Sequence, residues 1–321
     1  MDKNQMEIIS VDQLVPKNHA YRKMREIIDF EKIVSAVGLK DSEKGATGFT
    51  VFRLVMCMIL QFIEDLSDRE FQRFIAENLA AKWFCDFGLS WKTPDYSTVC
   101  KFRKKLGTKR MGIIFDEVKS QLNDHGYTED IFHFVDSTAL ISKLQMWEER
   151  DKAIADGYEK LNNKVIGKYA ADKDVRIGAK SKTKFWYGYK KTVSVGMKHG
   201  FINKIAVTKA NVNDADAVKH VLPKAGFVCG DKGFIPAIKL ITGRGLEPLI
   251  ILKNNMKEKN HYHDSWVSKL RAPYEGTFSK QNNRTRYKGV AKNQGAEFMH
   301  AIAFNLRRLL ALEKSRGVCC G

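Results

Sequence analysis

The stretch Ile131-Phe132-His133-Phe134-Val135-Asp136 decides the fold, because it is an apolar run that closes on a carboxylate. Such a run is typical of a buried strand. A second run, Phe227-Val228-Cys229-Gly230, is followed by Asp231, and the nearby Gly233 is typical of a turn. Open α/β sheets place their sites at the carboxyl ends of strands, so we expect Asp136 and Asp231 to stand at two such ends.

A third carboxylate, Glu275, lies in a segment where Tyr274 and Phe278 have the i, i+4 spacing of a helix. Three oxygen ligands on rigid elements favour Mg²⁺ or Mn²⁺ over zinc, which prefers His and Cys. The sequence therefore predicts a metal site made by Asp136, Asp231 and Glu275. Each aspartate taken alone also suits an ordinary strand end or turn.

The segments around these carboxylates predict an α/β domain over residues 131–321. Strands are expected at 192–197 and 202–208, joined by a hairpin turn at 198–200, and at 249–252. Helices are expected before and after the Asp231 strand, with a closing helix at 298–312. A charged insertion at about 148–184 interrupts the pattern. We interpret it as a helix followed by a mobile basic loop around 173–176 and 180–184.

Residues 1–130 predict an all-α domain. Phe52, Val55 and Ile59 follow helical spacing, and Ser67-Asp68-Arg69-Glu70 is a capping box that begins a second helix. A short basic helix around Arg103 and Lys104 is a candidate phosphate contact. A solvated helix face is an equally good interpretation.

The net charge of +18 is distributed unevenly along the chain. Residues 1–130 contain 20 Lys and Arg against 20 Asp and Glu, whereas residues 131–321 contain 35 against 17. A basic half with a few acidic residues at strand ends suits an enzyme that acts on a polyanion. The alternative is a basic surface that only confers solubility. The most basic segment follows Glu275 and contains Lys280, Arg284, Arg286, Lys288 and Lys292.

Other classes of protein find little support in the sequence. No Walker loop or dinucleotide fingerprint is found, so we expect no nucleotide cofactor. The six cysteines form no CxxC pair, which fits a reducing cytoplasm. We expect no signal peptide and no membrane association, because the apolar segment 51–63 is too short to span a bilayer and is better interpreted as a core helix.

Several motifs together resemble one family over nearly the whole chain. These are Leu66–Glu70, Pro94–Thr98, Tyr187–Lys190, Ala210–Asp214, Asp231–Phe234, and Arg271 one helical turn before Glu275. In these motifs the chain is similar to the DDE transposases of bacterial insertion sequences. The resemblance implies an α/β fold: a ribonuclease H-like mixed sheet flanked by helices, preceded by an all-α N-terminal domain. It also implies that this N-terminal domain, residues 1–130, serves DNA-end binding, dimerisation or both.

The resemblance also implies a function. Asp136, Asp231 and Glu275 would be the catalytic triad and would hold two Mg²⁺ ions, for which Mn²⁺ can substitute. The enzyme would cleave transposon ends and join the 3′-OH to target DNA in the bacterial cytoplasm, at the nucleoid, acting as a homodimer on double-stranded DNA. Arg271, Lys190 and the basic segment would contact DNA.

The chain departs from the related motif of this family at Ser268 and Asn282, where that motif has Tyr and Lys. Two alternatives stay open. One is a catalytically inactive or repurposed DNA-binding protein, and the other is a ribonuclease H-type nuclease.

Overall fold

The computed structural model describes residues 9–41, 48–128, 131–143, 171–180, 185–257, 259–279 and 283–319. The chain forms two compact units. One contains Met1–Gln121 together with Asn305–Gly321, and the other is Leu122–Phe304. The sequence predicted a division between residues 130 and 131, with the C-terminus in the second domain. The units do not follow that division because one continuous helix, α13 (Val290–Cys319), contributes to both.

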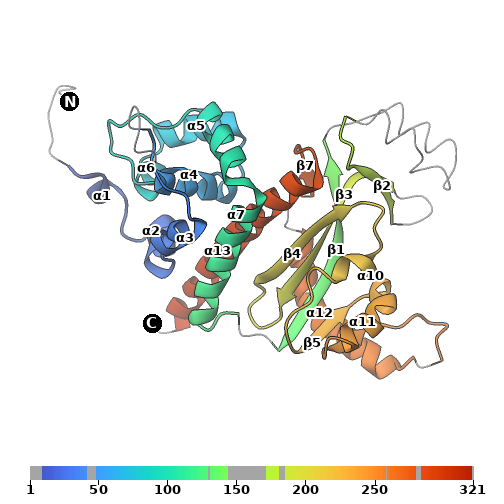
Figure 1. Ribbon diagram of the computed structural model, residues 1–321. Helices are drawn as coiled ribbons and strands as arrows, with labels where there is room; N and C mark the ends of the chain where they lie inside the picture. The colour runs from blue at the N-terminus through green and yellow to red at the C-terminus, as the bar shows by residue number, and fades with distance from the viewer. Residues whose placement is uncertain are drawn as a thin grey trace. The chain divides into compact units, whose positions relative to one another are not determined.

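The first unit is helical, as expected. Apart from the last part of α13, its helices are α1 (Val11–Leu14), α2 (Ala20–Ile27), α3 (Phe30–Val37), α4 (Val51–Ile63), α5 (Asp68–Glu77), α6 (Leu79–Phe84) and most of α7 (Tyr96–Asp124) (Figure 1). Helix α4 is buried along most of its length, which confirms it as a core helix. The capping box at Ser67 is also confirmed, since the Glu70 carboxylate accepts from the Ser67 N–H at 2.8 Å. Gly107 breaks α7 with a φ of 69°.

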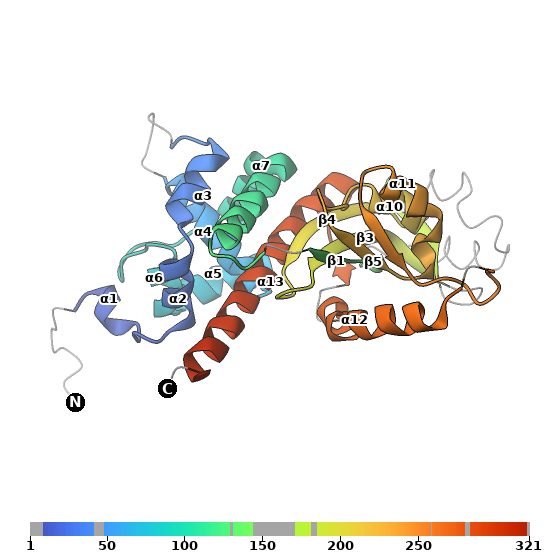
Figure 2. The same ribbon diagram turned by 90° about the horizontal axis from the view of Figure 1, so that it is seen from below.

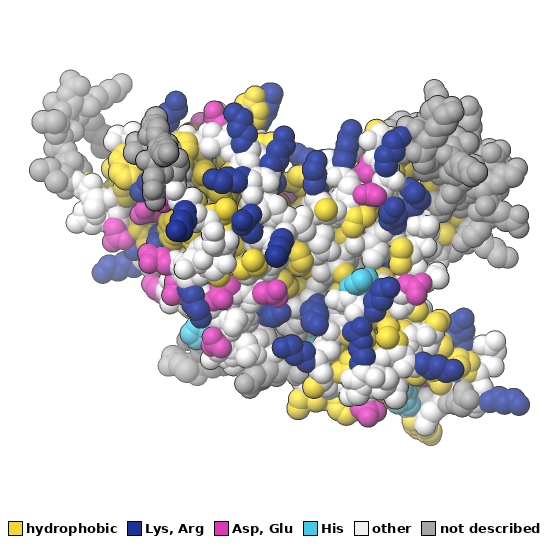
Figure 3. All heavy atoms as spheres, viewed as in Figure 1, with side chains coloured by type: hydrophobic (Ala, Val, Ile, Leu, Met, Phe, Trp, Pro, Cys, Tyr) yellow, Lys and Arg dark blue, Asp and Glu magenta, His cyan; other side chains and the backbone are white. Residues whose placement is uncertain are grey.

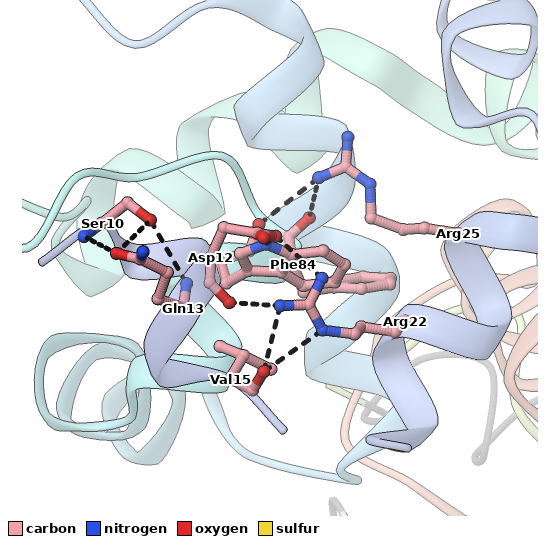
Figure 4. A network of polar contacts seen from close by, with 8 residues as sticks. Ser10, Asp12, Gln13, Val15, Arg22, Arg25 and Phe84 are labelled. Atoms are coloured by element: carbon pink, nitrogen blue, oxygen red, sulfur yellow. Dashed lines mark hydrogen bonds and ion pairs between the residues drawn. The ribbon is translucent and has the colours of Figure 1, made fainter. Parts of the chain in front are cut away.

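Two arginines of α2 hold the first helices of this unit together (Figure 4). The Arg22 guanidinium lies 4.5 Å from the Trp83 ring centroid and 2.7 Å from the Asp12 carboxylate. The Trp83 indole N–H also donates to Asp12, at 2.8 Å. Arg25 donates to the carbonyl oxygens of Trp83 and Phe84 at 3.3 and 3.4 Å. Both arginines therefore have a structural role within this unit, where they link α2 to α1 and α6.

The second unit is built on a mixed sheet. Its strands are β1 (Phe132–Ser142), β2 (Arg176–Ala179), β3 (Phe185–Gly196), β4 (Ile202–Lys209), β5 (Phe227–Gly230), β6 (Glu247–Ile250) and β7 (Arg284–Thr285). The main order is β4-β3-β1-β5-β6, with β1, β3 and β4 antiparallel and β5 and β6 parallel to β1. This is a ribonuclease H-like sheet, which confirms the expected fold class.

Helices cover the two faces of this sheet (Figure 2). On one face lie α10 (Asp214–Val218), the 3₁₀ helix η2 (Lys232–Ala237) and α11 (Ile238–Thr242), which pack Phe234 and Ile241 against Val135 and Val228. On the other face lies α12 (His261–Ser279), whose Arg271 guanidinium is 5.0 Å from the Phe134 ring centroid. The adjacent residues Phe134 and Val135 thus pack on opposite faces of the sheet, because successive side chains of a strand alternate between its faces.

The first turns of α13 pack beside β3 and β4. Gln294 accepts from the Val207 N–H at 2.6 Å and donates to the Ile205 carbonyl at 3.0 Å. Lys191 of β3 forms an ion pair with Glu297 at 3.4 Å, and their side chains are only 1% and 4% exposed. A charged pair buried this deeply makes the packing of α13 sensitive to single substitutions.

Two sequence expectations about local structure are corrected. Strand β1 does not end at Asp136 but continues to Ser142, since it stays paired with β3 as far as Ile141 and Gly188. The Ser137 and Thr192 hydroxyls hydrogen-bond across the two strands at 2.8 Å. The polar residues after Asp136 therefore remain in the strand, because β3 supplies hydrogen-bond partners for them.

The segment 173–176 is not a mobile basic loop. Val175 and Ile177 are buried, β2 pairs with β3, and the nearby Asp172 carboxylate accepts from the Gly289 N–H at 2.9 Å. The two apolar residues were the signal for a packed strand. Most of the predicted insertion, including the expected helix, lies outside the described residues. Within the described part of the chain, no helix has the length and apolarity needed to cross a membrane.

Candidate active site

The sheet register brings Asp136 and Asp231 next to each other. Parallel pairing of β1 with β5 includes the pair Phe134 and Cys229, and each aspartate follows two residues later along the chain. Asp231 is the first residue after β5 and the N-cap of η2, where its carboxylate accepts from the Gly233 N–H at 2.9 Å. Asp136 accepts from the Ser137 N–H at 2.8 Å. Both carboxylates are therefore held by local backbone bonds at one edge of the parallel part of the sheet.

The electrostatics of this edge are unfavourable for the Asp136 anion. Burial raises the pKa of Asp136 to about 6, and the negative charges of Asp231 and Asp214 add to this effect. The Ser137 N–H and the positive charge of Arg271 oppose it. A partly buried carboxylate with two anionic neighbours is a place where a bound cation would be stabilised.

Asp214 and Lys190 also belong to this neighbourhood, which the sequence did not predict. The Lys190 ammonium donates to the Asp214 carboxylate at 2.8 Å and to the Val212 carbonyl at 2.7 Å. A Cβ atom placed on Gly233 would lie 3.0 Å from an oxygen of Asp214 and 3.0 Å from an oxygen of Asp231. The two carboxylates therefore flank Gly233 closely.

Arg271 and Glu275 come from α12, in the helical segment that the sequence predicted. Arg271 is partly buried against Phe134. Burial raises the pKa of both Asp136 and Cys229, and the positive charge of Arg271 offsets part of each rise. Glu275 follows one turn later on the same helix, but its side chain lies outside the part of the structure that is described. The structure thus brings Arg271, Asp136 and Asp231 together and leaves the contribution of Glu275 a prediction.

The residues present suit a hard divalent cation. Asp136 and Asp231 offer carboxylate oxygens, the donors that Mg²⁺ and Mn²⁺ prefer. Among the described side chains, no group of three His, Cys, Asp or Glu is arranged to hold a metal ion. Glu275, whose side chain lies outside the described part, stays the predicted third ligand.

The expected DNA contacts divide into two groups. Arg284, Arg286, Lys288, Lys292 and Lys104 are exposed, and Lys280 lies outside the described residues. Arg103 and Lys190 differ from expectation, because their side chains are only 13% and 12% exposed and each pairs with an aspartate.

Arg103 turns inward for a simple reason. It lies three residues before the buried Leu106 and therefore shares the inner face of α7. Its guanidinium lies 2.5 Å from the Asp68 carboxylate and 2.9 Å from the Gln61 side-chain oxygen. Arg103 thus links α7 to α4 and α5, and we do not include it in the DNA interface.

The raised pKa of Asp136 predicts a pH-dependent stability. The folded protein binds this proton more tightly than the unfolded chain, so stability falls as pH rises from about 4 to 6 and stays lower above that. The shift corresponds to about 3 kcal/mol at pH 8 in metal-free buffer. Asp136→Asn removes the charge and should raise Tm at pH 8 but change it little at pH 4. An equal change at both pH values, measured by calorimetry with EDTA, would show that the charge is not the cause.

The second unit thus combines a ribonuclease H-like sheet with two neighbouring aspartates, one in β1 and one directly after β5. Two family models match this chain: Transposase domain (DUF772) matches residues 9–105, and Transposase DDE domain matches residues 159–306. The chain belongs to the DDE transposases.

No curated protein matches the chain. Among solved structures, it is similar to piggyBac transposase in a synaptic complex with hairpin DNA, with 11% identity and a TM-score of 0.45, over 93% of this chain and 75% of that one.

Proposed function

We propose that this protein is a DNA transposase that binds the terminal inverted repeats of an insertion sequence, cleaves the DNA at its ends and joins the 3′-OH to target DNA. The observation that carries the proposal is the register that sets Asp136 beside Asp231, in a chain of the DDE transposase family. The pKa of Asp136, raised to about 6, supports it, because a carboxylate left poorly compensated favours a cation.

In this proposal Asp136, Asp231 and Glu275 hold two Mg²⁺ ions, for which Mn²⁺ can substitute. When bound, the ions supply activation of a water or a 3′-hydroxyl and stabilisation of the leaving 3′ oxygen. The chain's own contribution is rigidity: Asp136 is fixed by its position in β1, and Asp231 by its bond to the Gly233 N–H. Arg271 offsets part of the Asp136 carboxylate charge, and its proposed role is to orient a scissile phosphate.

The DNA interface is proposed to use the exposed cations that follow α12. Arg284, Arg286, Lys288 and Lys292 are solvent-accessible and lie on β7, the segment after it and the start of α13. On the face drawn in Figure 3, Lys and Arg side chains are more widespread than Asp and Glu. Such a surface binds phosphates through counterion release, so its affinity should fall steeply with salt.

A second proposed DNA contact is Lys104 on α7, and its neighbour Arg103 provides a matched control. Lys104→Ala should weaken binding to a repeat-end duplex and reduce the salt dependence by about one counterion, with Tm unchanged. Arg103→Ala should instead lower stability by about 1–3 kcal/mol, because it leaves Asp68 without its partner. Fluorescence anisotropy at several salt concentrations and thermal unfolding separate the two effects. The reverse pattern would show that the assignment of inner and outer faces on α7 is mistaken.

The proposed function is tested by incubating the protein with a labelled duplex that carries the repeat flanking its gene, with Mg²⁺, and mapping the cleaved ends. We expect repeat-specific cleavage that leaves a 3′-OH, followed by joining to a target plasmid. Tight salt-sensitive binding without cleavage would favour the alternative of a DNA-binding protein. Cleavage of RNA–DNA hybrids without strand transfer would favour a nuclease.

We further propose that the active species is a homodimer, since two DNA ends must meet before they are joined. Mass photometry with the repeat-end duplex should show two chains for two duplexes. An active complex that contains one chain would rule this out.

A further inference from the structure

We propose that Asp214, anchored by Lys190, is a positioning residue of the candidate active site. It fixes the turn Asp231-Lys232-Gly233 and adds negative charge beside Asp231. The inference rests on the proposed function, because it concerns how the same site attracts its divalent cation. Neither residue supplies a metal ligand in this account.

The first observation is that Lys190 is held in place. Its ammonium makes two bonds, to the Asp214 carboxylate at 2.8 Å and to the Val212 carbonyl at 2.7 Å, and its side chain is only 12% exposed. A lysine that contacts DNA phosphate needs its ammonium at the surface. Lys190 instead joins the middle of β3 to the start of α10.

The second observation is the crowding around Gly233. One oxygen of Asp214 and one of Asp231 each lie 3.0 Å from the position that a Cβ atom on Gly233 would take. Gly233 also donates its N–H to Asp231 at 2.9 Å. The Asp214 carboxylate therefore packs directly against the turn that presents Asp231, and the missing side chain at position 233 is what allows this approach.

The third observation is the balance of charge. Two carboxylates brought to the same glycine repel each other, and the Lys190 ammonium offsets this on the Asp214 side. Asp231 faces no cation at hydrogen-bonding distance among the interactions of the described residues, whereas Asp214 does. The pair thus keeps an anionic group beside Asp231 at a fixed position, which favours a cation that Asp231 holds. Residues that orient metal ligands in this indirect way typically change metal affinity by 10–100-fold when they are replaced.

The test measures two concentrations. The first is the Mn²⁺ midpoint, the Mn²⁺ concentration at which half of the sites are filled, followed as loss of the free-ion EPR signal. The second is the metal concentration that gives half-maximal DNA cleavage. Asp214→Asn should raise both by about 10-fold. Lys190→Met should also raise both, because the Asp214 carboxylate loses the anchor that fixes its position. The double variant should be no worse than Asp214→Asn, because both residues act through one contact. Asp216→Asn is the matched control: this exposed aspartate is on the same helix and should change neither value.

Gly233→Ala tests the crowding independently and keeps all charges. It should raise the Mn²⁺ midpoint as well, since the added methyl group would displace one of the two carboxylates. This variant also decides the matter if replacing either member of the ion pair prevents folding. Its backbone is not in the left-handed region, so alanine itself adds no backbone strain.

Several results would overturn the inference. Equal Mn²⁺ binding by the wild type, Asp214→Asn and Gly233→Ala would remove it and leave the proposed function intact. Additive effects of Lys190→Met and Asp214→Asn would show that the two residues act separately. A loss of DNA affinity in Lys190→Met alone would return Lys190 to the DNA interface. Absence of both Mn²⁺ binding and cleavage in the wild type would overturn the proposed function together with the inference.

Discussion

Replacing Asp231 with asparagine should reduce DNA cleavage by a factor on the order of 10³ while leaving the protein folded and able to bind repeat DNA. The carboxylate stands at the end of β5, two residues after the pair that aligns β5 with β1, and is beside Asp136. Asparagine keeps an oxygen that can accept from the Gly233 N–H, so the turn should persist. What is lost is the charge that would hold a divalent cation.

The measurement is single-turnover cleavage of a labelled repeat-end duplex, with binding followed separately by anisotropy. Asp216→Asn is the control, because it removes one carboxylate from an exposed position of the same unit. Equal losses in Asp231→Asn and Asp216→Asn would indicate a general effect of charge. Full activity in Asp231→Asn would remove this residue from the proposed site.

The second large effect concerns the buried ion pair between Lys191 and Glu297. Either Lys191→Met or Glu297→Met should lower the free energy of unfolding by about 3–5 kcal/mol, because each leaves one buried charge without its partner. Burial already lowers the pKa of Lys191, and the Glu297 carboxylate only partly offsets that effect. The pair therefore contributes little net stability but is costly to break on one side.

The double variant Lys191→Met/Glu297→Met should recover most of the loss, since two apolar side chains of similar length can fill the same space. Urea unfolding of the four proteins completes the double-mutant cycle. If the losses of the single variants simply add in the double variant, then the two charges are not coupled across the packing of α13 on the sheet.

Much of the fold follows from local signals in the sequence. The apolar runs before Asp136 and Asp231 predicted β1 and β5, and the periodicity of residues 52–62 predicted α4. The capping box at Ser67 marked the start of α5. These features can be predicted because each depends on residues that are close together in the sequence.

The features that the sequence did not reveal depend on long-range pairing. The continuation of β1 past Asp136 requires β3 as a partner, and the Lys190–Asp214 pair joins residues 24 positions apart. From the sequence alone Arg103 is interpreted as a surface cation, because its partners, Gln61 of α4 and Asp68 of α5, are distant in the sequence. In each case the sequence contains the polar side chain but does not indicate which distant residue pairs with it.

The central claim, that Asp136 and Asp231 hold a divalent cation for DNA cleavage, is tested most directly by anomalous diffraction from crystals of the protein grown with a repeat-end duplex and Mn²⁺. We expect an anomalous peak roughly 2.1 Å from a carboxylate oxygen of Asp136 and of Asp231, with Glu275 completing the ligand set. A complex with ordered DNA in the site and no such peak between the two aspartates would contradict the claim.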